Sequence, residues 1–201
     1  MFRQTIAFLL ALTFLCAPAF AADAVSSATV DIDTLPEMEA YEGASTLVIY
    51  FSTDDTVKAV ALTAADALGA DVFEIIPEQP YTDADIAYYT DCRADREQAD
   101  DSARPGIAAW PDGMEQYDTV LLGYPIWHGQ APRIMYTLAE GLNLSGKTVV
   151  PFCTSASSPV GSSAENLRKL TDGSANWLNA WRVDNHSTAE DVRAWALNLK
   201  E

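Results

Sequence analysis

A buried strand followed directly by a helix is predicted by the pattern of residues 46–68, which read TLVIYFSTDDTVKAVALTAADAL. Residues 46–51 form an unbroken apolar, β-branched and aromatic run, which is typical of a strand covered on both faces. After the polar segment 52–56, small and apolar residues recur at helical spacing up to Leu68, and Gly69 ends the pattern. A strand that leads into a helix in this way indicates an α/β fold with a parallel sheet.

The rest of the chain repeats this alternation. Further strands are expected at residues 71–76, 117–124 and 147–153, and a short one at 179–183. Helices are expected to begin at Pro132, at a capping box of Ser162 and Glu165, and at a second capping box of Ser187 and Glu190. Strands that alternate with helices predict a doubly wound, three-layer α/β sandwich around a five-stranded parallel sheet of order 2-1-3-4-5.

Two features interrupt this regular pattern. Pro151 lies inside the fourth expected strand, and because proline cannot donate to a ladder, we expect a sheet edge or a strand exit there. Residues 78–116 are acidic, contain three prolines and are too long for a tight connection. We interpret them as an excursion from the sheet that carries one helix, from Ala84 to Gln98. Connections of this length are often functional or mobile.

Residues 1–21 have the features of an export signal. Arg3 supplies a positive start, residues 5–16 are an apolar core, and Ala19-Phe20-Ala21 is a small-x-small cleavage site. The apolar core is too short to span a bilayer, so we expect cleavage after Ala21 and no membrane insertion afterwards. The acidic, aperiodic residues 22–44 are expected to be a flexible leader, and residues 45–201 to form one domain. The predicted location is secreted or periplasmic.

The charge balance narrows the possible partners. The chain has 12 Lys and Arg against 29 Asp and Glu, a formal net charge of -17. Nucleic-acid binding is excluded because no basic surface is available to neutralise phosphates. An acidic surface could instead steer a basic redox partner protein towards the site. Cys92 and Cys153 could pair in an oxidising compartment, but two separate buried thiols are the favoured interpretation.

Polar and aromatic residues follow three of the expected strands, at the sheet edge where ligands bind in such folds. The segment 52–56 precedes a helix N-terminus, which favours a phosphate group. Trp127 offers an aromatic wall, and the segment 154–158 is rich in hydroxyl groups. These are the parts that a flavin mononucleotide (FMN) needs, so we predict FMN and no metal. The candidate cofactor-binding residues are Ser52, Thr53, Asp54, Asp55, Thr56, Pro125, Ile126, Trp127, His128, Gly129, Thr154, Ser155, Ala156 and Ser157.

Three motifs of the sequence resemble the flavodoxin family. They are Phe51-Ser52 before a helix, GYPIWHGQAPR at residues 123–133, and LSGKTVVPFCTS at residues 144–155. They are most similar to a flavodoxin-like branch that reads roughly YFSxTGxT, GxPIWWGxxPR and SGKTxxPFCTSGGS. The resemblance covers about residues 45–200. It implies a flavodoxin fold, FMN bound without a covalent bond, and electron transfer or flavin-dependent reduction of a small acceptor such as a quinone.

The departures from these motifs lie where the cofactor should bind. Asp54 and Asp55 stand where the motif has Thr and Gly, and Ala156-Ser157 replaces Gly-Gly. Each carboxylate would repel a phosphate dianion by up to about 4 kcal/mol at roughly 4 Å and an effective dielectric constant of about 20. His128 replaces a second Trp of the motif, which leaves Trp127 as the main stacking surface.

Several interpretations of these departures stay open. One of the two Asp could cap the following helix, so that a carboxylate occupies the phosphate position from within. A cation bridging both is another possibility. The leading hypothesis is an exported, FMN-binding redox protein. The alternative is a protein that has kept the fold, has lost FMN and acts as a binding or accessory protein.

Overall fold

The computed structural model describes residues 45–199, and the expected export signal and leader lie outside this range. A parallel sheet of order β2-β1-β3-β4-β5 runs through the centre of this part of the chain, so the predicted strand order is confirmed. Its main strands are β1 (Thr46–Tyr50), β2 (Asp71–Glu74), β3 (Thr119–Pro125) and β4 (Thr148–Thr154). No helix among the described residues is long and apolar enough to cross a membrane.

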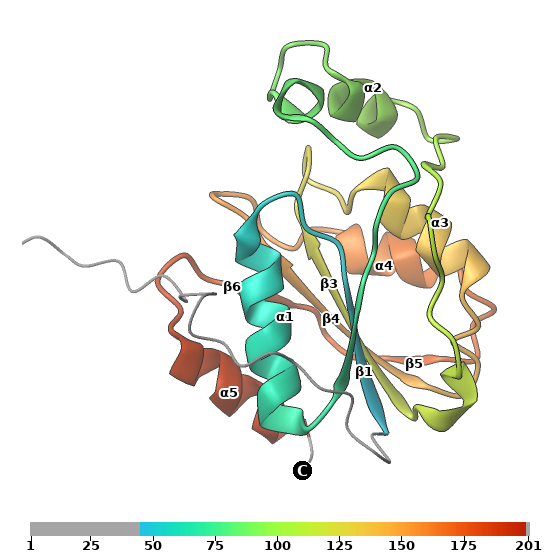
Figure 1. Ribbon diagram of the computed structural model, residues 1–201, viewed down its shortest axis with the longest axis vertical. Helices are drawn as coiled ribbons and strands as arrows, with labels where there is room; N and C mark the ends of the chain where they lie inside the picture. The colour runs from blue at the N-terminus through green and yellow to red at the C-terminus, as the bar shows by residue number, and fades with distance from the viewer. Residues whose placement is uncertain (1–44, 200–201) are drawn as a thin grey trace, which may run out of the picture.

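Helices cover both faces of the sheet (Figure 1). On one face lie α1 (Asp55–Leu68) and α5 (Ala189–Asn198), which contact each other. On the other lie α3 (Arg133–Gly141) and α4 (Ser163–Arg168). Each face has its own apolar core, because strands buried on both faces present apolar side chains alternately to the two helical layers. The predicted three-layer sandwich is therefore confirmed.

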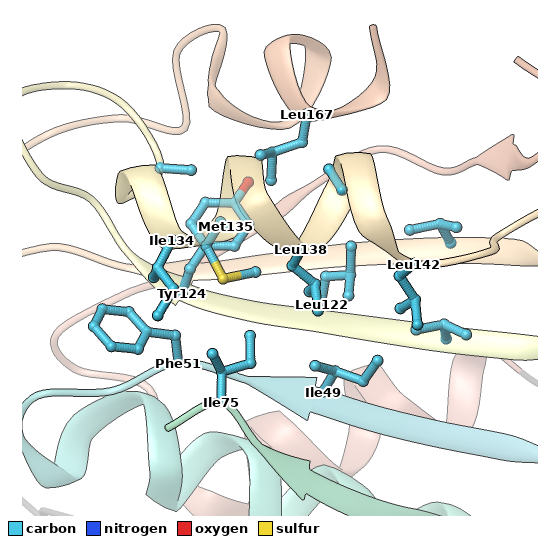
Figure 2. Packing of buried hydrophobic residues seen from close by; sticks show 14 of the residues in the cluster. Ile49, Phe51, Ile75, Leu122, Tyr124, Ile134, Met135, Leu138, Leu142 and Leu167 are labelled. Atoms are coloured by element: carbon cyan, nitrogen blue, oxygen red, sulfur yellow. The ribbon is translucent and has the colours of Figure 1, made fainter. Parts of the chain in front are cut away.

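The core under α3 shows how the sheet and its helical cover fit together (Figure 2). Ile134, Met135 and Leu138 of α3 are almost fully buried against Leu122 and Tyr124 of β3. Gly123 lies between these two strand residues and has Phe152 of β4 beside it. A Cβ at Gly123 would lie 2.2 Å from a carbon of that phenyl ring, so no larger residue fits there without a shift.

The fifth expected strand is two short strands, β5 (Asn176–Trp177) and β6 (Trp181–Val183), which pair with different parts of β4. This break corrects the interpretation of Pro151, which is neither at an edge nor at an exit. Pro151 pairs with Leu122 on the β3 side, and on the other side it faces the gap between β5 and β6. Because neither β5 nor β6 pairs with Pro151 on that side, the N–H that proline lacks is not needed for a ladder hydrogen bond there.

The excursion differs from the single helix predicted over 84–98. It contains a 3-10 turn, η2 (Asp83–Ile86), the helix α2 (Arg93–Ala99) and a second 3-10 turn, η3 (Met114–Gln116). Tyr89 and Asp91 have positive φ between the first two elements, which breaks the helix that the sequence pattern suggested. In Figure 1 the excursion places α2 beyond the sheet, at the end where α1 begins.

Both predicted capping boxes are wrong in detail. The hydroxyl of Ser162 accepts a hydrogen bond from the Gln130 amide instead of a helix N–H, and Glu165 pairs with Arg168. At α5 the box lies one residue later, formed by Thr188 and Asp191. The prediction of two separate thiols is confirmed, since Cys92 and Cys153 are both free and buried.

Candidate functional site

The loops that follow β1, β3 and β4 meet at one pocket of about 670 Å³, which lies within the range of small-molecule sites. A fourth segment, residues 183–187 at the end of β6, also lines the pocket. The pocket is lined by Asp54, Asp55, Thr56, Ala59, Val60, Pro125, Ile126, Trp127, Thr154, Ser155, Ala156, Val183, Asp184, Asn185 and Ser187. The structure thus brings together nine of the predicted residues, while Ser52, Thr53, His128, Gly129 and Ser157 do not line this pocket.

The loop before α1 is organised around the carboxylate of Asp54. Asp54 is the N-cap of α1, and its Oδ1 accepts hydrogen bonds from the backbone N–H of Thr56 at 3.0 Å and from the Thr56 hydroxyl at 2.6 Å. The hydroxyl of Ser52 donates to the carbonyl oxygen of Asp54. Of the interpretations left open for this loop, the capping carboxylate is therefore the one that the structure contains.

The loop after β3 presents Trp127 to the pocket and turns His128 away from it. The half-buried indole of Trp127 meets the rings of Phe51 and Tyr81 edge to face, at centroid distances of 5.6 and 5.3 Å. His128 and Gly129 both have positive φ, which closes the turn between Trp127 and Gln130. Gly129 is the residue that adopts this conformation without strain.

The imidazole of His128 belongs to a separate cluster on the excursion. Its Nε2 lies 2.7 Å from Oδ1 of Asp95, and its ring packs against the exposed pair Tyr88 and Tyr89. Ring centroids of His128 and Tyr88 are 5.0 Å apart. The substitution of the motif's second Trp by His therefore serves docking of the excursion rather than the lining of the pocket.

The excursion also fixes the loop after β3 through hydrogen bonds. The side-chain amide of Gln98 donates to the carbonyl oxygens of Trp127 and Ala131, at 3.1 and 3.2 Å, and accepts from the backbone N–H of Arg133 at 3.0 Å. The buried guanidinium of Arg133 donates in turn to the carbonyl oxygens of Glu97 and Gln98. The position of the Trp127 ring thus depends on a segment some thirty residues earlier.

The wall formed by residues 183–187 was missed by the sequence analysis. Arg182 donates to the carbonyl oxygens of Ser155 and Ser158, and Asn185 donates to that of Ala156, so this segment braces the hydroxyl-rich loop. A usable signal was present: the last expected strand ended at Val183, and the carboxyl end of a parallel strand points to the ligand edge. The rule that located the other three loops applies equally to this one.

The pocket lining includes both apolar and acidic side chains. Ile126, Trp127 and Val60 offer a wall suited to a flat aromatic ring, with the hydroxyl of Thr154 beside it. Three Asp side chains, Asp54, Asp55 and Asp184, line the pocket. No Lys or Arg stands among the described residues that line it. The pKa of Asp184 is lowered, chiefly because its carboxylate accepts a hydrogen bond from the His186 N–H. A flavin ring fits this lining, but a phosphate dianion does not.

Cys153, at the end of β4, is not a reactive group. Burial raises the pKa of its thiol to about 11, so the nucleophilic thiolate is scarce at neutral pH. Within residues 45–199, no group of three or more His, Cys, Asp or Glu side chains is placed to hold a metal ion.

Comparisons with known proteins agree with this architecture. The sequence model of the flavodoxin family matches residues 45–199. A solved structure from Bacteroides eggerthii, named as an inferred flavoprotein, is 38% identical with a TM-score of 0.71, covering 79% of this chain and 99% of that one. A similar protein from Bacteroides uniformis is 33% identical with the same TM-score and the same coverage.

A flavoprotein from Lactobacillus acidophilus, solved in complex with FMN, shares the fold at 24% identity and a TM-score of 0.58, covering 69% of this chain and 93% of that one. No curated protein matches the chain. The family match spans nearly all of the described residues, and the sheet order and the pocket at its carboxyl edge agree with it. The chain belongs to the flavodoxin family.

Proposed function

We propose that the protein binds a flavin non-covalently in the pocket at the carboxyl ends of β1, β3 and β4. The observation that carries this proposal is the indole of Trp127 at the pocket wall, packed edge to face on Phe51 and Tyr81, with Gln98 donating to the backbone carbonyl oxygen of Trp127. A ring held on several sides offers a flat partner to an aromatic ligand at little cost in side-chain entropy. FMN, the flavin named with the Lactobacillus acidophilus structure, is the reference ligand.

Each part of the pocket has a role in this proposal. Ile126 and Trp127 would cover the flavin ring and exclude water from it, while Thr154 and the backbone of Ser155 and Ala156 would bind its polar edge. A bound flavin accepts and releases electrons, and the protein's contribution is to bind, orient and tune it. The function we propose is electron transfer or the flavin-dependent reduction of a small acceptor such as a quinone.

The setting follows from the rest of the chain. We propose that residues 1–21 are an export signal and that the protein works in the periplasm or outside the cell. The net charge of -17 favours a basic protein as electron donor or acceptor, because opposite charge accelerates encounter.

Flavin binding is tested by titrating riboflavin and FMN separately into the purified protein and following the quenching of flavin fluorescence. We expect saturable quenching by at least one of them. Trp127→Ala should weaken that binding at least tenfold. Trp110→Ala is the matched control, because Trp110 packs on Gly141 of α3 and does not line the pocket, and it should change affinity less than twofold. Circular dichroism checks that both variants fold.

Redox function is tested on the loaded protein. The bound flavin is reduced with dithionite and mixed with a water-soluble quinone, and its absorbance near 450 nm, a property of oxidised flavins, is followed as it returns.

A second candidate function is favoured by one observation, the capping of α1 by Asp54. If neither flavin binds, the flavin proposal is refuted, and the alternative hypothesis of a binding or accessory protein is the one that remains to be tested.

A further inference from the structure

We propose that the pocket takes a flavin without its phosphate, so that riboflavin is the preferred ligand and FMN is disfavoured. This inference rests on the proposed flavin site and concerns which flavin that site accepts. Riboflavin and FMN share the ring and the ribityl chain and differ only in the terminal phosphate. A difference in their affinities therefore reports on the polar end of the pocket alone.

Three donors that could serve a phosphate at this loop are already occupied. The N–H and the hydroxyl of Thr56 both donate to the Asp54 carboxylate, and the Ser52 hydroxyl donates to the Asp54 carbonyl oxygen. A phosphate at the first turn of α1 would have to displace a carboxylate that is part of the chain and whose effective concentration is correspondingly high. The helix end is thus closed by its own N-cap.

A second helix begins at the same pocket, and it is closed in the same way. Ser187 lines the pocket directly before α5. The Thr188 hydroxyl accepts from the Asp191 N–H, and the Asp191 carboxylate accepts from the Thr188 N–H and hydroxyl. Both helix N-termini that could attract an anion at this pocket therefore carry a carboxylate of the protein.

The charges on the pocket wall act in the same direction. Asp54, Asp55 and Asp184 line it, and carboxylates are ionised at neutral pH. Arg182 does not line the pocket; it donates to the carbonyl oxygens of Ser155 and Ser158 and lies 3.4 Å from Asp184. An incoming dianion meets net negative charge without a compensating cation.

A neutral ribityl chain meets the opposite situation. Its hydroxyl groups are hydrogen-bond donors, and carboxylates are strong acceptors that take more than one such bond. Thr154, Asn185 and Ser187 add neutral polar groups to the same wall. The acidic end of the pocket therefore suits a polyol and repels a phosphate ester, which is the discrimination that we infer.

The test compares the two flavins in fluorescence titrations of the full-length protein at low and high salt. We expect riboflavin to bind at least tenfold more tightly than FMN at about 20 mM ionic strength, where the Debye length is about 20 Å, compared with about 3 Å at 1 M. Salt should improve FMN binding and leave riboflavin unchanged, because screening weakens only the repulsion. Equal or tighter binding of FMN in the native protein would overturn the inference while leaving the proposed flavin site intact.

A charge-removal variant identifies the cause. Asp54→Ser with Asp55→Asn retains a good N-cap and removes two charges, so the affinity for FMN relative to that for riboflavin should rise at least tenfold. The control is Asp83→Asn with Asp112→Asn, which removes the same charge from exposed residues of the excursion and should alter neither affinity. An equal gain in the control would refute a local origin. Absence of binding by either flavin to the native protein would refute the proposed function and this inference with it.

Discussion

Replacing Asp54 by Ala should destabilise the protein by an amount that its hydrogen bonds define. The substitution removes the acceptor of the Thr56 N–H at 3.0 Å and of the Thr56 hydroxyl at 2.6 Å. The hydroxyl can turn to water or to Thr154, 3.4 Å away, so the backbone N–H is the main loss. Removing an N-cap costs about 1 kcal/mol, and losing a negative charge at a helix N-terminus adds about 0.5 kcal/mol.

For a domain of this size, about 1.5 kcal/mol corresponds to a decrease in Tm of roughly 3 to 6 °C. Thermal unfolding followed by circular dichroism measures the shift, and urea unfolding measures the free energy independently. Asp54→Ser is the matched control, because Ser is an equally good N-cap and should lose only the charge contribution of about 0.5 kcal/mol. If Ala and Ser destabilise the protein equally, or if neither does, the carboxylate is not the cap and the explanation of the closed helix end fails.

Three further predictions follow from groups away from the pocket. Gly123→Ala places a Cβ 2.2 Å from a carbon of Phe152, so we expect a loss of about 1–3 kcal/mol in urea unfolding, and an unchanged midpoint would contradict the close packing. Desolvation alone would raise the pKa of Asp95, but hydrogen bonds from the facing imidazole and from backbone N–H groups outweigh it and lower that pKa in the folded state. The resulting stability is present above the unfolded-state pKa and lost as pH falls through the folded-state pKa. Asp95→Asn should therefore be less stable than the native protein at pH 7, and the difference should disappear below the folded-state pKa. In a background with Cys16→Ser and Cys92→Ser, which leaves one cysteine, the buried Cys153 thiol, with its pKa raised to about 11, should react with a thiol reagent at pH 8 only as fast as the protein opens. Reaction at the rate of a free thiol would show that it is accessible.

The parts of the fold that the sequence pattern predicted are those governed by local periodicity. The buried strand at residues 46–50 and the helix after it could be recognised because their apolar residues follow the spacing of a strand and then of a helix. The strand order followed from the alternation of strands and helices. The approximate positions of β2, β3 and β4 were recognised for the same reason, with ends displaced by one or two residues.

The parts that could not be predicted depend on contacts between distant segments. The break between β5 and β6 is satisfied by different parts of β4, which no local pattern encodes. The hydroxyl of Ser162 is used by Gln130, 32 residues earlier, although the local sequence matches a capping box. Likewise, His128 follows Trp127 directly in the sequence, and only its partner Asp95 on the excursion shows that the two rings face different surroundings.

The excursion cannot be removed without loss, because it carries the side-chain amide of Gln98 that binds the loop after β3. A variant trimmed between β2 and β3 would leave the carbonyl oxygens of Trp127 and Ala131 and the N–H of Arg133 without their present partner. Each polar group left without a partner lowers the free energy of unfolding by about 1–3 kcal/mol where water cannot replace the partner. A minimal version of this scaffold therefore has to keep α2 in place, or rebuild one carboxamide at the same point in space, before it can present a tryptophan at its ligand edge.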